Sequence, residues 1–259
     1  MMTTPVLSIE HVGVQFGGLT ALSDLNFSVG EGEIVSLIGP NGAGKTTAFN
    51  IMTGFLTPTK GHVRYRGAVL AGLKPNQIAD LGLIRTFQRT SVFPNDTVFD
   101  NVLIGLHRRN KVSLPESVFG LPRARSSERW LRERAEEIIG WVGLDARRHD
   151  LAGSLSYGEQ RLVGVALALA AEPSVLLLDE PVSGMNASET HTFVQLIRNI
   201  RDRGVTILLV EHDMPMVMSV SDRIVVLNYG RIIAEGLPEA IRTNPDVIEA
   251  YLGKGVRHA

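Results

Sequence analysis

Eight residues with the sequence Gly-Pro-Asn-Gly-Ala-Gly-Lys-Thr occupy positions 39–46 and constrain the fold more than any other part of the chain. They match the phosphate-loop pattern G-x-x-x-x-G-K-[ST] at Gly39, Gly44, Lys45 and Thr46. The glycines let the backbone turn tightly so that its N–H groups surround phosphate oxygens, and the N-terminus of a following helix favours an anion. Lys45 is predicted to reach the β- and γ-phosphates of a nucleotide, and the Thr46 hydroxyl to bind Mg²⁺.

The segments on both sides of this loop support the same interpretation. Residues 33–38 form a short apolar run typical of a buried strand, and residues 47–53 have the pattern of a helix. A strand, a glycine-rich loop and a helix in this order are the context that the motif requires. We therefore expect the loop to bind ATP through Asn41, Gly42, Ala43, Gly44, Lys45, Thr46 and Thr47.

Hydrophobic patterning divides the chain into an α/β part and a helical part. Between about residues 89 and 171 the spacing of apolar residues predicts helices and no strand. Elsewhere alternating or continuous apolar runs predict strands at residues 7–16, 25–29, 33–38, 63–67, 175–178, 205–210, 224–227 and 232–233.

The predicted fold is a single α/β domain over residues 1–259, with the core of a phosphate-loop NTPase of the RecA-like type. We expect an antiparallel β region near the N-terminus and an all-helical subdomain inserted at about 89–171. A short helical tail is expected at about 238–253.

Composition excludes several classes of protein. The chain has no cysteine, so disulfides, thiolate metal sites and cysteine nucleophiles are excluded. Its net charge of −1 gives no overall attraction to nucleic acid, which we do not expect as a partner. The longest apolar stretch, residues 162–171, is about half of what a bilayer crossing needs, and the N-terminus lacks the pattern of a signal peptide. We expect a chain that is soluble by itself and reaches a membrane only through a partner.

Two carboxylates, Asp179 and Glu180, follow the predicted strand at 175–178. In open α/β sheets ligands bind at the carboxyl ends of the strands. Asp179 is predicted to hold Mg²⁺, mostly through water, and Glu180 to act as the general base that polarises the attacking water.

The sequence Leu-Ser-Tyr-Gly-Glu-Gln at 155–160 precedes an apolar helical segment. Ser156 and Glu159 have the spacing of a capping box, which is a purely structural interpretation. With this segment the chain resembles the nucleotide-binding subunits of ABC transporters, whose L-S-G-G-Q-type signature lies between the phosphate loop and the Asp-Glu strand. The resemblance implies that Ser156 and Gly158 contact the nucleotide bound by the other subunit of a head-to-tail dimer. Tyr157 replaces the first glycine, and either Glu159 or Gln160 fills the role of the signature glutamine.

Further sequence motifs of this family occur in the expected order along the chain. Gln88 matches the Q-loop glutamine, which in the family senses Mg²⁺ and water, and His212 matches the switch histidine that contacts the γ-phosphate. Residues 183–186 occupy the D-loop position. Phe16 matches the aromatic residue that stacks on adenine, although its place at the end of an alternating strand also suits a core residue.

Several short sequence segments resemble one branch of the family, the ATPase subunits of branched-chain amino-acid importers. The resemblance implies a homodimer or a heterodimer with a paralogous ATPase subunit, working with integral membrane permease subunits and, indirectly, with a periplasmic solute-binding protein. It also implies a position at the cytoplasmic face of the inner membrane. The segments that carry this resemblance are residues 16–22, 85–88, 210–214 and 244–253.

Two alternatives remain at this stage: the ATPase subunit of an exporter, for example of lipids, and a soluble ABC-type ATPase without a transport role. A third, a nucleotide-binding module without turnover, is disfavoured by the presence of both Glu180 and His212. The resemblance also places the docking groove for a membrane subunit at about residues 89–101, with Phe93 as a candidate apolar anchor or a core residue. Residues 107–134 contain eight Arg or Lys against three Glu, which fits a solvated surface or one that approaches anionic lipid.

Overall fold

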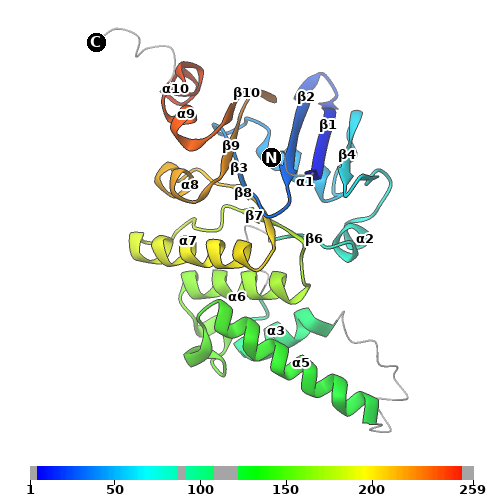
Figure 1. Ribbon diagram of the computed structural model, residues 1–259, viewed down its shortest axis with the longest axis vertical. Helices are drawn as coiled ribbons and strands as arrows, with labels where there is room; N and C mark the ends of the chain where they lie inside the picture. Colours follow the sequence, from blue (N-terminus) through cyan, green and yellow to red (C-terminus); the bar gives the residue numbers. More distant parts are fainter. Residues whose placement is uncertain (1–4, 87–91, 108–121, 253–259) are drawn as a thin grey trace. The chain divides into compact units, whose positions relative to one another are not determined.

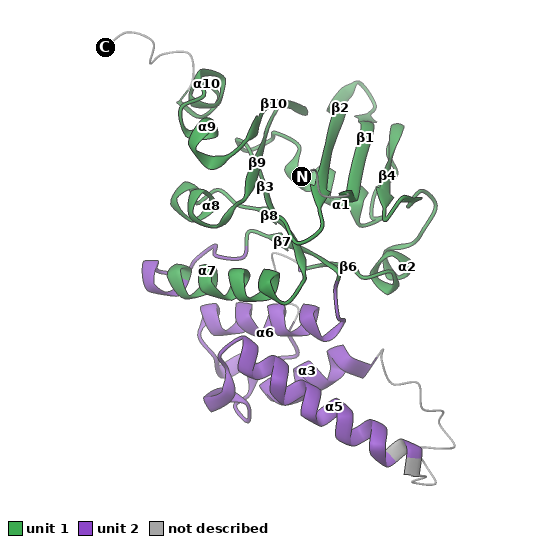
Figure 2. Ribbon diagram, in the orientation of Figure 1, with its two compact units in different colours: residues 1–85, 174–180, 190–259 green, residues 86–173, 181–189 purple. Residues whose placement is uncertain are grey.

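The computed structural model describes residues 5–86, 92–107 and 122–252. They belong to two compact units (Figure 2). The first contains residues 1–85, 174–180 and 190–259, and the second contains residues 86–173 and 181–189. Over the described ranges, no helix has both the length and the apolar character needed to cross a membrane.

A six-stranded sheet forms the centre of the first unit, with the strand order β10-β9-β3-β8-β7-β6 (Figure 1). Five strands are parallel, and β10 lies antiparallel on the edge beside β9. Every residue of β3, β7 and β8 is buried, as expected for parallel strands covered on both faces. The bounds are β3 Ile34–Ile38, β6 Leu83–Arg85, β7 Val175–Asp179, β8 Thr206–Val210, β9 Arg223–Asn228 and β10 Arg231–Gly236.

The first unit also contains an antiparallel sheet of four strands in the order β2-β1-β4-β5. Its long strands alternate buried and exposed residues, because one face packs on the core and the other meets solvent. The bounds are β1 Pro5–Phe16, β2 Leu19–Gly30, β4 Lys60–Tyr65 and β5 Ala68–Val69.

The helices of the first unit include α1, which follows β3 after the phosphate loop and places Phe49 and Met52 in the core. Helix α7 begins in the second unit and continues in the first. The bounds are α1 Lys45–Met52, α2 Pro75–Asp80, α7 Ala187–Asp202, α8 Met214–Val220, α9 Pro238–Arg242 and α10 Pro245–Leu252.

The second unit is helical over its described residues. Helices α3 and α6 approach so closely that a Cβ atom on Gly105 would lie 2.8 Å from the Cβ of Ala170, so only glycine fits there. The helices are α3 Val98–Leu106, α5 Pro122–Trp141 and α6 Tyr157–Ala170, with 3₁₀ turns η2 Asp145–Arg147 and η3 Ala152–Ser154.

The predicted α/β fold with a phosphate-loop core is confirmed, and each predicted strand has a counterpart in the structure. The sequence did not reveal β6, whose three residues are too few to show a periodic pattern. Strand β6 pairs in parallel with β7, and this pairing brings Arg85 to the edge where Asp179 lies.

Candidate active site

Three neighbouring strands, β3, β8 and β7, carry the predicted catalytic segments at their carboxyl ends. Strand β3 leads into the phosphate loop, β8 into His212, and β7 into Asp179 and Glu180. Because parallel strands end at the same edge of a sheet, segments far apart in the sequence meet there. The sheet order thus brings the three predicted segments to the same edge of the sheet.

The phosphate loop needs two of its glycines for steric reasons. Gly39 has φ 153°, and a Cβ there would lie 2.0 Å from the carbonyl oxygen of Leu227. Gly44 has φ 108°, and a Cβ there would lie 2.7 Å from Cδ2 of Leu22. Neither the backbone angles nor the space admits a side chain at these positions.

Lys45 is buried and closes the loop on itself. Its Nζ donates hydrogen bonds to the carbonyl oxygens of Gly39 at 2.6 Å and Pro40 at 3.0 Å. Burial lowers the pKa of the Lys45 ammonium, while the nearby carboxylates of Glu180 and Asp179 act in the opposite direction. The oxygens of a bound phosphate can replace these two carbonyl oxygens as acceptors for the Lys45 ammonium.

A cavity of about 340 Å³ contains the phosphate loop in its wall. All seven predicted loop residues, 41–47, line it together with Glu180 and Tyr229. Leu19, Thr20 and Ala21 of β2 complete the lining, and Leu19 pairs with Phe16 across the hairpin. Phe16 is 51% exposed, so it is not a core residue.

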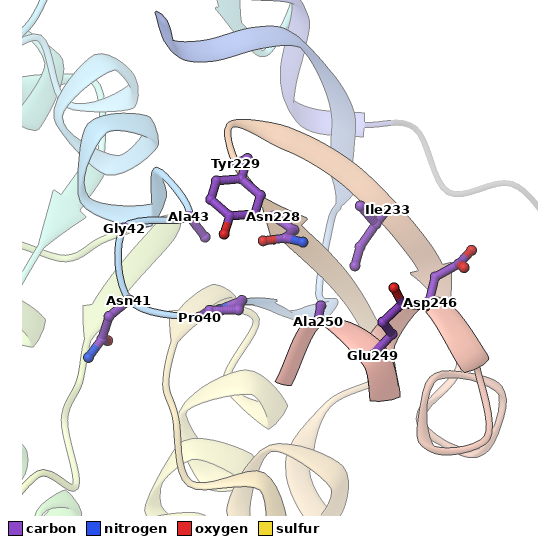
Figure 3. A pocket seen from close by; sticks show the side chains of 10 residues that line it. All are labelled: Pro40, Asn41, Gly42, Ala43, Asn228, Tyr229, Ile233, Asp246, Glu249 and Ala250. Atoms are coloured by element: carbon purple, nitrogen blue, oxygen red, sulfur yellow. The ribbon is translucent and has the colours of Figure 1, made fainter. Parts of the chain in front are cut away.

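A larger cavity, about 700 Å³, is lined in part by residues 40–43 (Figure 3) and so shares residues 41–43 with the smaller one. Asp246 and Glu249 of α10 line it, and none of the described residues in its wall is Lys or Arg. Two carboxylates without a cation repel a phosphate, whereas in the smaller cavity Lys45 offsets the charge of Glu180. Charge therefore favours the smaller cavity as the candidate site for nucleotide phosphates.

Asp179 ends β7 and is 3% exposed. Its Oδ2 accepts a hydrogen bond from Nη2 of Arg85 at 2.6 Å. Its carboxylate and the Thr46 hydroxyl are oxygen donors of the kind that Mg²⁺ prefers. Within the described ranges no group of three or more His, Cys, Asp or Glu could hold a metal. This donor set fits magnesium, which takes few protein ligands and completes its shell with phosphate and water.

Glu180 directly follows β7 and lines the smaller cavity. Its φ is 46°, in the left-handed region that non-glycine residues rarely adopt. A backbone hydrogen bond from its N–H to the carbonyl oxygen of Val210, at 2.8 Å, holds this conformation. Strain of this kind persists where neighbouring structure enforces it, and it gathers at functional sites.

The ring of His212 is 62% exposed just after β8. Glu211, fully buried, accepts hydrogen bonds from the backbone N–H groups of His212 at 2.9 Å and Asp213 at 3.3 Å. Asp213 caps α8 by accepting from the N–H of Met216. Glu211 thus fixes the turn that presents His212. Sequence reasoning missed this role, although a carboxylate directly after an apolar strand was the available signal.

In the second unit, Ser156 caps α6. Its Oγ accepts from the N–H of Glu159 at 3.3 Å, and the Ser156 N–H donates to Oε2 of Glu159 at 2.9 Å, so the predicted capping box is confirmed. Hydrogen bonding to the Ser156 backbone lowers the pKa of Glu159. Gln160 donates from Nε2 to the carbonyl oxygen of Leu155.

Tyr157, the residue that departs from the signature pattern, packs within the second unit. A Cβ on Gly184 would lie 3.1 Å from Cε1 of Tyr157, so a glycine at the D-loop position makes room for the ring. Arg161 donates to the Tyr157 hydroxyl at 2.6 Å. Gly158 faces Glu189, whose Oε1 would be 3.0 Å from a Cβ at that position.

The remaining predicted residues are placed as follows. Gln88 and residues 108–121 lie outside the described residues. Phe93 is 46% exposed, so it is not a core residue. Helix α5 has five arginines against four glutamates, and Arg132 pairs with Glu128 at 3.0 Å. Within residues 122–134 the count is five arginines against two glutamates, so the described part of the basic stretch keeps its positive charge.

Known proteins resemble this chain over nearly its whole length. The family model "ABC transporter" matches residues 22–183, and "Branched-chain amino acid ATP-binding cassette transporter" matches residues 231–257. The high-affinity branched-chain amino acid transport ATP-binding proteins BraF of Pseudomonas aeruginosa and LivG of Escherichia coli K12 are each 44% identical to it. Each alignment covers 98% of this chain and 100% of the relative.

Solved structures agree with this likeness. The crystal structure of a nucleotide-free ATP-binding cassette from an ABC transporter superimposes with a TM-score of 0.83 and 30% identity, covering 97% of this chain and 100% of the other. The dimeric structure of a bacterial ABC transporter cassette gives a TM-score of 0.75 and 26% identity, covering 90% and 98%. From the matched family model and these nearly full-length relatives, we conclude that this chain belongs to the ABC transporter family, as an ATP-binding subunit that hydrolyses ATP.

Proposed function

We propose that this ATP-binding subunit drives the import of branched-chain amino acids or a related small solute. The main support is its 44% identity, over 98% of its length, to subunits named for branched-chain amino acid transport. The match of residues 231–257 to the model of that branch supports the same solute class. Both observations favour an importer over an exporter or a soluble ATPase.

The proposed chemistry takes place at the carboxyl ends of β3, β7 and β8. The loop N–H groups and Lys45 bind the phosphates, and the Phe16 ring stacks on the adenine. Glu180 takes the proton of the attacking water, and His212 orients this water against the γ-phosphate. The burial of Lys45, the strained backbone of Glu180 and the exposure of Phe16 support these roles.

Mg²⁺ is the proposed metal cofactor. The Thr46 hydroxyl would bind it directly, Asp179 would hold it mostly through water, and Gln88 would sense it. When bound, magnesium neutralises phosphate charge as it develops in the reaction.

Family members of this kind dimerise and work with membrane permease subunits. For this chain we propose a head-to-tail dimer, with itself or with a paralogue, in which Ser156 and Gly158 of each subunit contact the nucleotide bound by the other. Closure around ATP and reopening after hydrolysis then move the permease through alternating access. A periplasmic solute-binding protein would deliver the solute, and this subunit would lie at the cytoplasmic face of the inner membrane.

Uptake measurements test this proposal. Cells that lack the gene should lose uptake of labelled leucine, isoleucine and valine, and the wild-type gene should restore it. The gene that encodes Glu180→Gln should not restore uptake, because the variant subunit still assembles but has lost its general base. Glu31→Gln, at an exposed carboxylate, is the matched control and should restore uptake. Unchanged uptake of all three amino acids in the deletion strain would refute branched-chain amino acids as the solute.

A further inference from the structure

A buried arginine lies beside the predicted magnesium site. Arg85 is the last residue of β6, and its side chain is 7% exposed. Its Nη2 donates to Oδ2 of Asp179 at 2.6 Å, and the Asp179 side chain is itself 3% exposed. A charged hydrogen bond between two buried groups fixes their geometry strongly, because neither group can turn to water instead.

The same guanidinium joins three elements of the first unit. Its Nη1 donates to Oδ1 of Asn50 on α1 at 2.7 Å, and its Cζ lies 5.4 Å from the centre of the Phe49 ring. Helix α1 begins at Lys45. One side chain therefore connects β6, the end of β7 and the helix of the phosphate loop. A lysine has no planar fork of donors with which to hold Asn50 and Asp179 in the same way.

We propose that Arg85 is a positioning residue, which orients the Asp179 carboxylate toward the magnesium site by holding its Oδ2 on a guanidinium anchored at Asn50. This inference rests on the proposed role of Asp179 in binding magnesium. Groups that orient a metal-binding side chain commonly affect metal affinity almost as strongly as the side chain itself. Sequence reasoning did not single out Arg85, because its partners are distant in the sequence.

The test measures how much magnesium strengthens nucleotide binding. The affinity for a fluorescent ATP analogue is measured in EDTA and in excess Mg²⁺. The magnesium ratio is the affinity in Mg²⁺ divided by the affinity in EDTA, and it is compared between variants. Arg85→Gln should lower this ratio at least about tenfold, because Asp179 loses its orientation. A purely electrostatic role predicts a higher ratio, because ATP without magnesium carries more negative charge and suffers more from the loss of the arginine.

A double-mutant cycle shows whether Arg85 acts through Asp179. Asp179→Asn should lower the ratio by itself, and adding Arg85→Gln should lower it no further. Arg85→Lys should lower the ratio as Arg85→Gln does. A lysine keeps the positive charge but lacks the planar set of N–H donors that holds both Asn50 and the Asp179 carboxylate. Asn50→Ala should change the ratio in the same direction by a smaller factor.

Arg223→Gln is the matched control. Arg223, at the start of β9, donates to Glu33 at 2.8 Å and pairs with Glu235, away from the phosphate loop. Its loss should lower the melting temperature while the magnesium ratio keeps its wild-type value. If Arg85→Gln does not fold, Arg85→Lys and Asn50→Ala decide the question on the same measurement.

Three results would overturn the inference. A wild-type or raised ratio in Arg85→Gln and Arg85→Lys would exclude positioning. An undiminished effect of Arg85→Gln in the Asp179→Asn background would show that Arg85 does not act through this carboxylate. A wild-type ratio in Asp179→Asn itself would refute the magnesium role of Asp179, and the inference with it. If Asp179→Asn lowers the ratio and Arg85→Gln does not, only the inference about Arg85 fails.

Discussion

The phosphate loop and the signature segment are both predicted to bind the same nucleotide, but they are built differently. Lys45 is buried, and its ammonium is held by carbonyl groups of its own loop at the edge of a parallel sheet. Ser156 is exposed at the start of α6, and Tyr157 beside it is 48% exposed. The bonds of Ser156 to Glu159 are those of a capped helix. The first region lines a cavity within one unit, whereas Ser156 and Tyr157 of the second are exposed and Gly158 beside them is buried. An exposed Ser156 suits the contact proposed in trans.

The largest expected effect concerns the first region alone. Glu180→Gln should slow ATP hydrolysis at least about 100-fold, because the general base is lost, while ATP affinity stays within about threefold of wild type. With ATP and Mg²⁺ the variant should accumulate as a dimer in size-exclusion chromatography. Glu31→Gln serves as the control for loss of one carboxylate. Wild-type turnover in Glu180→Gln would show that Glu180 is not the base.

A change in the second region should separate turnover from binding. Ser156→Arg should lower turnover to less than about a tenth, because a bulky cation stands where the other subunit's nucleotide is contacted, and leave ATP affinity of the monomer unchanged. Ser154→Arg adds the same charge at a nearby exposed serine and should retain activity. Ser156→Ala controls for the lost cap, which costs about 1 kcal/mol. Weaker ATP binding by the Ser156→Arg monomer would contradict the assignment in trans.

Phe93→Asp tests the docking segment expected at residues 89–101, of which the structure describes 92–101. The side chain is 46% exposed, so the substitution leaves the core intact. We expect ATP binding to persist while the subunit leaves the membrane fraction of cells that contain the permease, because a charge replaces an apolar anchor. Leu81→Asp, at an exposed apolar position in the other unit, is the control. Retained membrane association and uptake in Phe93→Asp would refute the docking site.

The smallest expected effect concerns the capping box. The pKa of Glu159 is lowered in the folded protein, so its charge stabilises the fold above its unfolded pKa, and this contribution is lost as the pH falls through the folded pKa. Glu159→Gln should cost roughly 0.5 kcal/mol at pH 7 and progressively less below about pH 4. Thermal unfolding at several pH values measures this difference, with Glu136→Gln on the exposed face of α5 as control. A difference that is constant with pH would show that the charge has no part in the cap.

The sequence predicts well what depends on local pattern. The phosphate loop, the strand ends at Asp179 and His212 and the capping box at Ser156 each follow from short motifs with a physical reason. Contacts between distant residues could not be predicted. Arg85 lies in a strand of three residues and meets Asp179 only because β6 pairs with β7. Tyr157 fits at the signature because Gly184, distant in the sequence, leaves space for its ring.

A mixture of two inactive variants tests the central claim, that each active site combines the phosphate loop of one subunit with the signature segment of another. Lys45→Ala and Ser156→Arg should each be inactive alone. In a symmetric head-to-tail dimer the mixed pair has both lesions in one site and neither in the other. ATP hydrolysis by the equimolar mixture should therefore recover to roughly a quarter of wild type, since about half of the dimers are mixed and each has one intact site. No recovery, with mixed dimers demonstrated by cross-linking, would contradict the composite site.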